Sequence, residues 1–126
     1  MDAFSRERYL KIALVVIGIL FIFAIYPMMM WIWPSGWGWT PRQPEYEQMI
    51  AGIYATLGVF LIRAAKDPGA NASLIWFTIW SSLIHGGIML MQALADKSER
   101  ANLLGDVPAL FLIAGLLWYL MPKRRG

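Results

Sequence analysis

The chain has 126 residues, of which 59% are apolar and only 15% are charged, whereas soluble domains average roughly 45–50% and about 25%. A soluble domain of this size could not bury so much apolar surface, so the composition excludes one and indicates a membrane protein. The chain contains no cysteine and its net charge is +3, which excludes disulfides and cysteine metal sites and gives no indication of nucleic-acid binding.

Four stretches without Asp, Glu, Lys or Arg indicate where the chain crosses the membrane. These stretches are residues 12–41, 48–62, 68–95 and 107–122. A spanning helix needs about 20 mostly apolar residues, so the first and third stretches are long enough, whereas the second and fourth need charged groups at the membrane boundary. The predicted helices extend over residues 9–33, 45–64, 72–94 and 106–121. A protein with two spans and two interfacial segments is the alternative.

The first predicted helix contains a proline in its second half. Pro27 has no backbone N–H and crowds the carbonyl of Phe23, so we expect a kink at this point. Residues 34–41 contain two prolines and two glycines, which is typical of an irregular loop.

Small and capping residues mark the other predicted helices. In the second helix, Ala51, Gly52 and Ala55 offer a surface on which another helix can pack closely. Asn71 and Asp106 precede apolar runs and are expected to cap the third and fourth helices, because their side chains can accept from free backbone N–H groups.

Basic residues lie mainly on one side of the four predicted spans. Eight of the eleven are Arg6, Arg8, Lys11, Arg63, Lys66, Lys123, Arg124 and Arg125. Because basic residues in short loops mark the cytoplasmic face, we predict an all-α membrane protein. It is a single antiparallel bundle of four transmembrane helices (residues 1–126) with both termini in the cytoplasm. Aromatic residues expected to form a belt at the opposite interface are Trp31, Trp33, Trp37, Trp39 and Tyr46.

The third predicted helix carries a polar stripe at steps of three and four residues. Its members are Thr78, Ser81, Ser82, His85, Met89 and Gln92. Polar side chains are costly in lipid, so this stripe should face the interior of the bundle. The opposite face, expected to contact lipid, comprises Ile75, Phe77, Ile79, Leu83 and Leu90.

Three further ionisable residues are expected near His85. Tyr54 should lie at a similar depth on the second helix, and Glu47, seven residues earlier, lies on nearly the same face. Asp106 begins the fourth helix from that side too. The sequence therefore predicts a funnel in the outer half of the bundle, with Glu47 and Asp106 leading to Tyr54 and His85.

These residues have a structural and a functional interpretation. In the first, the polar residues of the stripe join helices by hydrogen bonds, His85 is neutral and Asp106 is a cap. In the second, His85 carries a proton or binds a ligand. Metal variants would use His85 and Met89 for a soft ion such as Cu(I), and Gly86 and Gly87 would let a flat macrocycle approach. The sequence assigns no particular cofactor.

Several segments resemble a known family. They are residues 45–47, 57–61, 64–68, 81–87 and 105–110. The histidine that follows paired serines and the Gly-Asp-x-Pro start of the last helix are the most specific marks. From Tyr9 onward the chain resembles a bacterial family of small four-helix membrane proteins described only as a domain of unknown function. This resemblance implies a bacterial origin and a membrane location, and it implies no activity.

No catalytic motif accompanies these features, since the sequence shows no nucleophile beside a base and no phosphate-binding glycine loop. We therefore expect a non-enzymatic protein of the bacterial inner membrane, an accessory or scaffold subunit. Its partners would be the lipid bilayer and other membrane subunits or further copies of itself. The alternative is a bundle that handles a small ligand, a metal or protons through His85, Glu47, Asp106 and Tyr54. A small membrane enzyme acting on a lipid or quinone is a third hypothesis.

Overall fold

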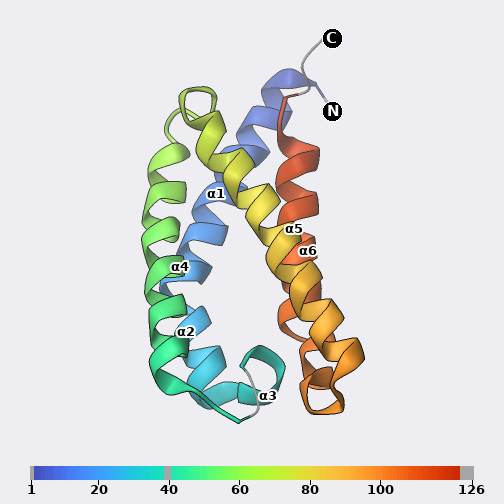
Figure 1. Ribbon diagram of the computed structural model, residues 1–126. Coiled ribbons are helices and arrows are strands. Elements are labelled where there is room, and N and C mark those ends of the chain that lie inside the picture. Colours follow the sequence, from blue (N-terminus) through green and yellow to red (C-terminus); the bar gives the residue numbers. More distant parts are fainter. Residues whose placement is uncertain (1, 39–40, 123–126) are drawn as a thin grey trace.

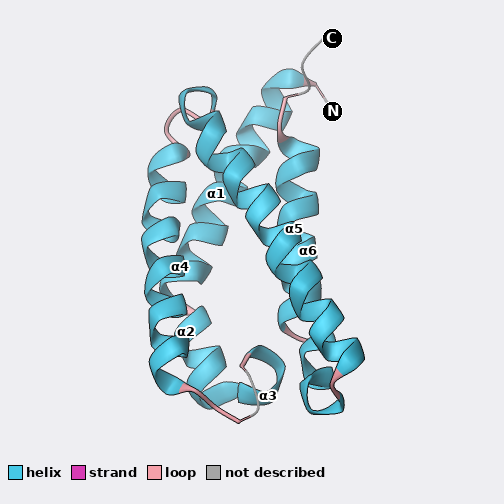
Figure 2. Ribbon diagram, viewed as in Figure 1, coloured by secondary structure: helices cyan, strands magenta, loops and turns pink. Residues whose placement is uncertain are grey.

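The computed structural model describes residues 2–38 and 41–122, and all regular structure in these ranges is helical (Figures 1 and 2). The long helices are α1 (Ala3–Phe23), α4 (Pro44–Ala64), α5 (Ala72–Ala95) and α6 (Asp106–Leu120). The short ones are α2 (Ile25–Pro27), η1 (Met28–Ile32), α3 (Pro34–Trp37), η2 (Gly69–Asn71) and η3 (Lys97–Leu103). Four residues used in the topology prediction, Trp39, Lys123, Arg124 and Arg125, lie outside the described residues.

Two helical stretches of the described chain are long and apolar enough to cross a membrane, Gly69–Ala95 and Lys97–Leu120. A third candidate is the pair Ala3–Phe23 and Ile25–Ile32, whose two parts are bent by 45°. Helix α4 does not meet the same criterion. The fold is therefore all-helical, with two or three helices suited to a membrane.

The bend after α1 lies where the proline predicts it. Helix α1 ends at Phe23, whose carbonyl a continuous helix would direct at the ring of Pro27. The chain continues as the π-helix η1, in which the N–H of Trp33 bonds to the carbonyl of Met28. The expectation of an irregular segment after it is wrong for residues 34–37, because Pro34 starts the short helix α3 at a position that needs no N–H donor.

Helices α1 and α4 meet at a pair of glycines. A Cβ on Gly18 would lie 2.6 Å from the carbonyl oxygen of Gly58, and a Cβ on Gly58 would lie 2.5 Å from that of Gly18. Only glycine at both positions permits so close a crossing. The small-residue surface expected at Ala51, Gly52 and Ala55 is wrong for Gly52, where a Cβ would meet nothing within 4 Å, whereas Ala51 is buried.

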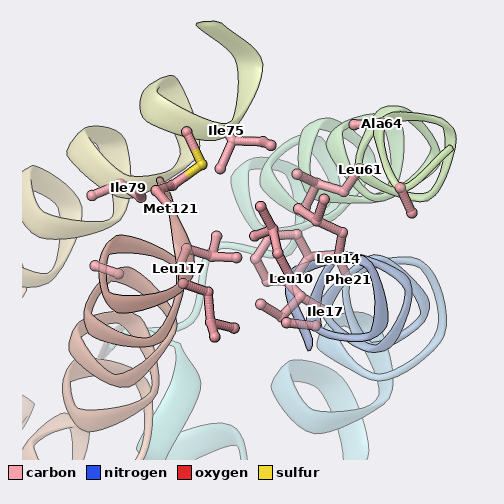
Figure 3. Packing of buried hydrophobic residues seen from close by; sticks show 14 residues of the cluster. Leu10, Leu14, Ile17, Phe21, Leu61, Ala64, Ile75, Ile79, Leu117 and Met121 are labelled. Atoms are coloured by element: carbon pink, nitrogen blue, oxygen red, sulfur yellow. The ribbon is translucent and has the colours of Figure 1, made fainter. Parts of the chain in front are cut away.

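The larger of the two hydrophobic clusters of the described chain lies along α1 from Leu10 to Phe21 and around the end of α6, and Figure 3 shows the packing of its side chains. All four long helices contribute to it. Its fully buried large side chains are Leu10, Leu14, Leu61, Ile75, Ile79 and Leu117. The guanidinium of Arg6 also stacks over the ring of Tyr119, 5.6 Å from its centroid, near the end of α6. Figure 1 shows the pair α5 and α6 diverging from the pair α1 and α4 toward the end of the molecule that carries α3 and η3.

One of the two expected caps occupies its predicted position. Asn71 is the N-cap residue of α5, but its side chain makes no capping bond and instead donates to the carbonyl of Asp67 at 2.9 Å. The residue before α6 is Gly105, so that Asp106 is the first residue of the helix and not its cap. The Asp106 side chain is thus left for another role.

The faces of α5 also differ from the prediction. Ile75 and Ile79, expected to contact lipid, are 0% and 1% exposed, because all four helices converge beside them. The exposed ridge of α5 consists of Phe77, Trp80, Ile84, Ile88 and Met91. Apart from Phe77, which was predicted, and Ile88, the exposed positions follow the expected ones by one residue: Trp80 follows Ile79, Ile84 follows Leu83 and Met91 follows Leu90.

Candidate functional site

A cavity of about 330 Å³ lies between the two helix pairs, beyond the core and toward α3. Its walls are mainly apolar. The lining residues used below are Phe21, Met28, Met29, Trp37, Gly38, Glu47, Tyr54, His85, Met89, Asp106 and Ala109. Because α1, α2, α3, α4, α5 and α6 all contribute, the cavity forms only when the whole chain folds.

Four residues that the sequence places in a funnel line this one cavity: Glu47, Tyr54, His85 and Asp106. Glu47 and Tyr54 come from the first half of α4, His85 from the middle of α5 and Asp106 from the start of α6. Seven residues of helix separate Glu47 from Tyr54, so the two side chains lie about 10 Å apart along the helix axis. The cavity therefore has polar groups at two levels.

The deeper level is a tyrosine–histidine pair. The Tyr54 hydroxyl and the His85 Nδ1 are 2.5 Å apart and hydrogen-bonded, and this bond links α4 to α5. Phe21 packs edge-on against the Tyr54 ring, with 5.0 Å between centroids. The bond to Nδ1 fixes the orientation of the imidazole, which leaves its second ring nitrogen to meet a ligand.

The level nearer α3 is centred on Glu47. Its side chain is 3% exposed, and the Oε2 atom lies 3.5 Å from the guanidinium of Arg42. The other carboxylate oxygen, Oε1, is buried and has no hydrogen-bond partner in the described part of the chain, and the same is true of the indole N–H of Trp37. Two buried polar atoms, each belonging to a residue of the cavity lining, are therefore unsatisfied by the protein's own described residues.

Helix α3 closes this end of the cavity through close backbone contacts. A Cβ on Gly38 would lie 2.9 Å from the Glu47 Oε1, and a Cβ on Gly105 would lie 2.5 Å from the carbonyl oxygen of Gly36. Glycine at these positions lets the backbone approach the carboxylate and lets α3 rest against the start of α6. Glu47 is thus covered by backbone rather than by a partner side chain.

Arg42 holds the outer side of the same carboxylate. Its guanidinium also lies 3.3 Å from the carbonyl oxygen of Met29 and 3.4 Å from that of Met30. The Arg42 side chain is 43% exposed. Its charge is therefore shared among three acceptors and partly solvated, which weakens its pairing with Glu47.

The remaining candidates from the sequence lie elsewhere, except Met89, which lines the cavity. Ser81 bonds to the carbonyl of Thr78 in its own helix at 3.3 Å, and Ser82 is buried but does not line the cavity. Gln92 is exposed. Within residues 2–38 and 41–122, no group of three or more His, Cys, Asp or Glu side chains is arranged to hold a metal ion.

Sequence reasoning missed the contribution of the segment between the first two long helices. Trp37 and Gly38 were expected in an interfacial belt or an irregular loop, yet both line the cavity, as do Met28 and Met29. The sequence contains one indication of this contribution, which is Arg42. It is a basic residue on the side of the predicted bundle opposite the termini, where basic residues are few. A buried acidic partner such as Glu47 accounts for its position.

Chemically, the site combines an apolar chamber with a few fixed hydrogen-bonding groups. Such a chamber suits a small lipophilic molecule with a polar end.

Comparison with known proteins gives one finding. No curated protein and no solved structure matches the chain. The model of a family of unknown function, DUF6632, matches residues 5–124. The match includes the cavity and, apart from the first two residues of α1, every helix of the described chain, and the chain therefore belongs to the family of unknown function DUF6632.

Proposed function

We propose that this protein binds a small lipophilic molecule inside the membrane, in the cavity between its two helix pairs. The cavity itself is the observation that carries the proposal. Its volume of about 330 Å³ falls within the 300–1,000 Å³ typical of ligand pockets. At roughly 30 Å³ for each water-sized group, it accommodates a ligand of about ten non-hydrogen atoms.

The proposed membrane arrangement has four spans, with α4 crossing together with the other three long helices. Helix α4 contains 21 residues and packs along α1 through the glycine pair. Of its two acidic residues, Glu45 lies exposed in the first turn, where the helix would meet the membrane boundary, and Glu47 lines the cavity, which lowers the cost of placing this helix in a membrane. The excess of basic residues beside the start of α1 and the end of α6 supports cytoplasmic termini, with the bacterial inner membrane as the location.

In this proposal, the apolar body of the ligand contacts the walls and its polar end meets the fixed groups. Met28, Met29 and Met89 are unbranched and flexible side chains that adapt to different shapes. The Tyr54–His85 pair and Glu47 supply the polar contacts. The protein acts by binding, without a catalytic step.

The experiment is native mass spectrometry of the protein released gently from its own membrane. Ala109→Phe places a ring in the cavity, whereas Leu112→Phe alters a side chain of the same helix that is 72% exposed. We expect additional bound mass on the wild type and on Leu112→Phe and its loss from Ala109→Phe. Ala24→Phe fills the cavity from the other pair and repeats the test if the first variant misfolds. The same bound mass on both filled variants would contradict the proposal.

A second candidate function is that of an accessory subunit. The observation that favours it is the exposed ridge of α5, where Phe77 and Trp80 are 61% and 59% exposed in the first half of the helix. Tryptophan favours membrane interfaces over the hydrocarbon interior, so a protein partner would cover this ridge well. A stoichiometric partner in the same mass spectra supports this candidate, and a solitary chain argues against it.

A further inference from the structure

We infer that the ligand is a lipophilic amine, bound with its protonated nitrogen against Glu47. This inference rests on the proposed function, since it names the chemical class that the same cavity accepts. It concerns the level of the cavity nearest α3, where one oxygen of the Glu47 carboxylate, Oε1, has no hydrogen-bond partner among the described residues.

The Glu47 carboxylate is buried and only partly hydrogen-bonded. The residue is 2% exposed, and its Oε1 has no hydrogen-bond partner in the described chain. A buried carboxylate is stable only when it is paired and hydrogen-bonded. Arg42 pairs with the carboxylate only in part. Its guanidinium lies 3.5 Å from Oε2 and also bonds to the backbone carbonyls of Met29 and Met30. A donor that enters the cavity and reaches Oε1 completes the pairing.

The acidic side chains of the lining determine which sign of ligand charge the cavity favours. Asp106 is a second carboxyl group in the lining, and Arg42, which touches Glu47 from outside, is not among the lining residues. In the state in which both carboxyl groups are ionised, they outnumber this single guanidinium, and this state repels an anionic ligand and attracts a monovalent cation.

One aromatic residue of the lining belongs to the Glu47 level of the cavity. Trp37 borders this level, whereas Phe21 and Tyr54 border the deeper one. Aromatic faces attract an ammonium group, and this attraction strengthens where water is excluded. A neutral alcohol can donate a hydrogen bond to Glu47, but it gains neither the ionic nor the cation–aromatic contribution.

The test uses three ligands that share an eight-carbon chain: octylamine, 1-octanol and octanoate. Each has nine or ten non-hydrogen atoms, which matches the cavity at about 30 Å³ per water-sized group. The full-length protein is placed in nanodiscs of zwitterionic phosphatidylcholine, so that charged lipid does not attract the amine. Saturable binding of radiolabelled octylamine is measured, with the other two as competitors and the cavity-filled Ala109→Phe disc as the background.

We expect octylamine to bind at least tenfold more tightly than 1-octanol to the wild type, and octanoate to compete poorly. Glu47→Gln should weaken octylamine binding about ten- to a hundredfold, as loss of a charged hydrogen bond does, and leave the affinity for 1-octanol within about twofold. Glu45→Gln is the matched control, because this residue lies in the same helical turn and is exposed. It should leave all three affinities unchanged.

The outcomes separate the two proposals. Equal binding of octylamine and 1-octanol to the wild type overturns the amine inference and leaves the lipophile-binding function intact. The same is true if Glu47→Gln reduces both affinities equally. If Glu47→Gln misfolds, the comparison of the three ligands on the wild type still decides. No saturable binding of any of the three, together with no bound mass on the native protein, overturns the function itself.

Discussion

Substituting one glycine at the crossing of α1 and α4 should destabilise the protein, although alanine favours helices. In Gly58→Ala, the new methyl would lie 2.5 Å from the carbonyl oxygen of Gly18, 2.9 Å from the Ile22 side chain and 3.1 Å from that of Phe21. An ordinary contact begins at 3.4 Å. The two backbones therefore have to separate by about 0.9 Å, the difference between these two distances.

The net magnitude follows from two opposing effects. Forcing an additional carbon into a packed contact costs about 1–3 kcal/mol, and replacing glycine by alanine within a helix returns about 0.5–1 kcal/mol. We expect Gly58→Ala to lower the free energy of unfolding by about 0–2.5 kcal/mol, with a central value of about 1.3 kcal/mol. Gly52→Ala, on the same helix with nothing within 4 Å of its Cβ, should raise it by about 0.5–1 kcal/mol.

The assay is denaturation of both variants and the wild type in mixed micelles, followed by circular dichroism at 222 nm (the standard helix band). The comparison between the two variants removes the shared effect of helix propensity. If Gly58→Ala is as stable as Gly52→Ala, the close crossing of α1 and α4 does not exist and the reasoning is wrong.

Three further predictions concern polar side chains. Tyr54→Phe should lower the free energy of unfolding by about 1–3 kcal/mol in the same assay, because it leaves His85 Nδ1 without its partner in a buried site; an unchanged value would mean that the pair is not formed. Thr78→Val should change it by less than about 1 kcal/mol, because this hydroxyl bonds only to a carbonyl in the preceding turn of its own helix. Hydrogen bonds from the hydroxyl of Ser98, which is the larger cause, and from its backbone N–H hold the pKa of Asp96 below its ordinary value of 3.8. The ionised Asp96 side chain therefore stabilises η3. This stabilisation is present above pH 3.8 and is lost as the pH falls through the lowered pKa. A carbon NMR titration of Asp96 should have its midpoint below 3.8, and Ser98→Ala should raise it.

Long apolar runs and helical periodicity explain which parts of the fold could be predicted. The runs locate the long helices, and Pro27 locates the bend, because both effects act within a few residues of sequence. The crossing of α1 and α4 could not be located in this way. Gly52 and Gly58 are six residues apart and thus about 120° apart around the helix. Only the packing with Gly18 selects the second one.

The residues that line the cavity could be predicted where a single helix face determines them, and they could not be predicted where several elements meet. Glu47 and Tyr54 share a face by their spacing, and both line the cavity with His85. Gln92 was misassigned because the buried line of α5 runs through Met89 and Ala93, and Gln92 lies about 100° from the latter. The role of α3 depends on backbone contacts with residues far along the chain, for which the local Pro and Gly content gives no signal.

The division of the molecule into two helix pairs has a thermodynamic consequence. Each pair is a continuous part of the chain, residues 3–64 and 72–120, and the cavity walls come from both. Under the proposed function, a ligand in the cavity becomes part of the contact between the two halves. By mass action, a concentration of one hundred times Kd would add about 2.7 kcal/mol to the stability of the assembled chain. The stability of an occupied protein would then rise with the logarithm of the ligand concentration, so that the resistance of the two halves to separation would report how much ligand surrounds the protein.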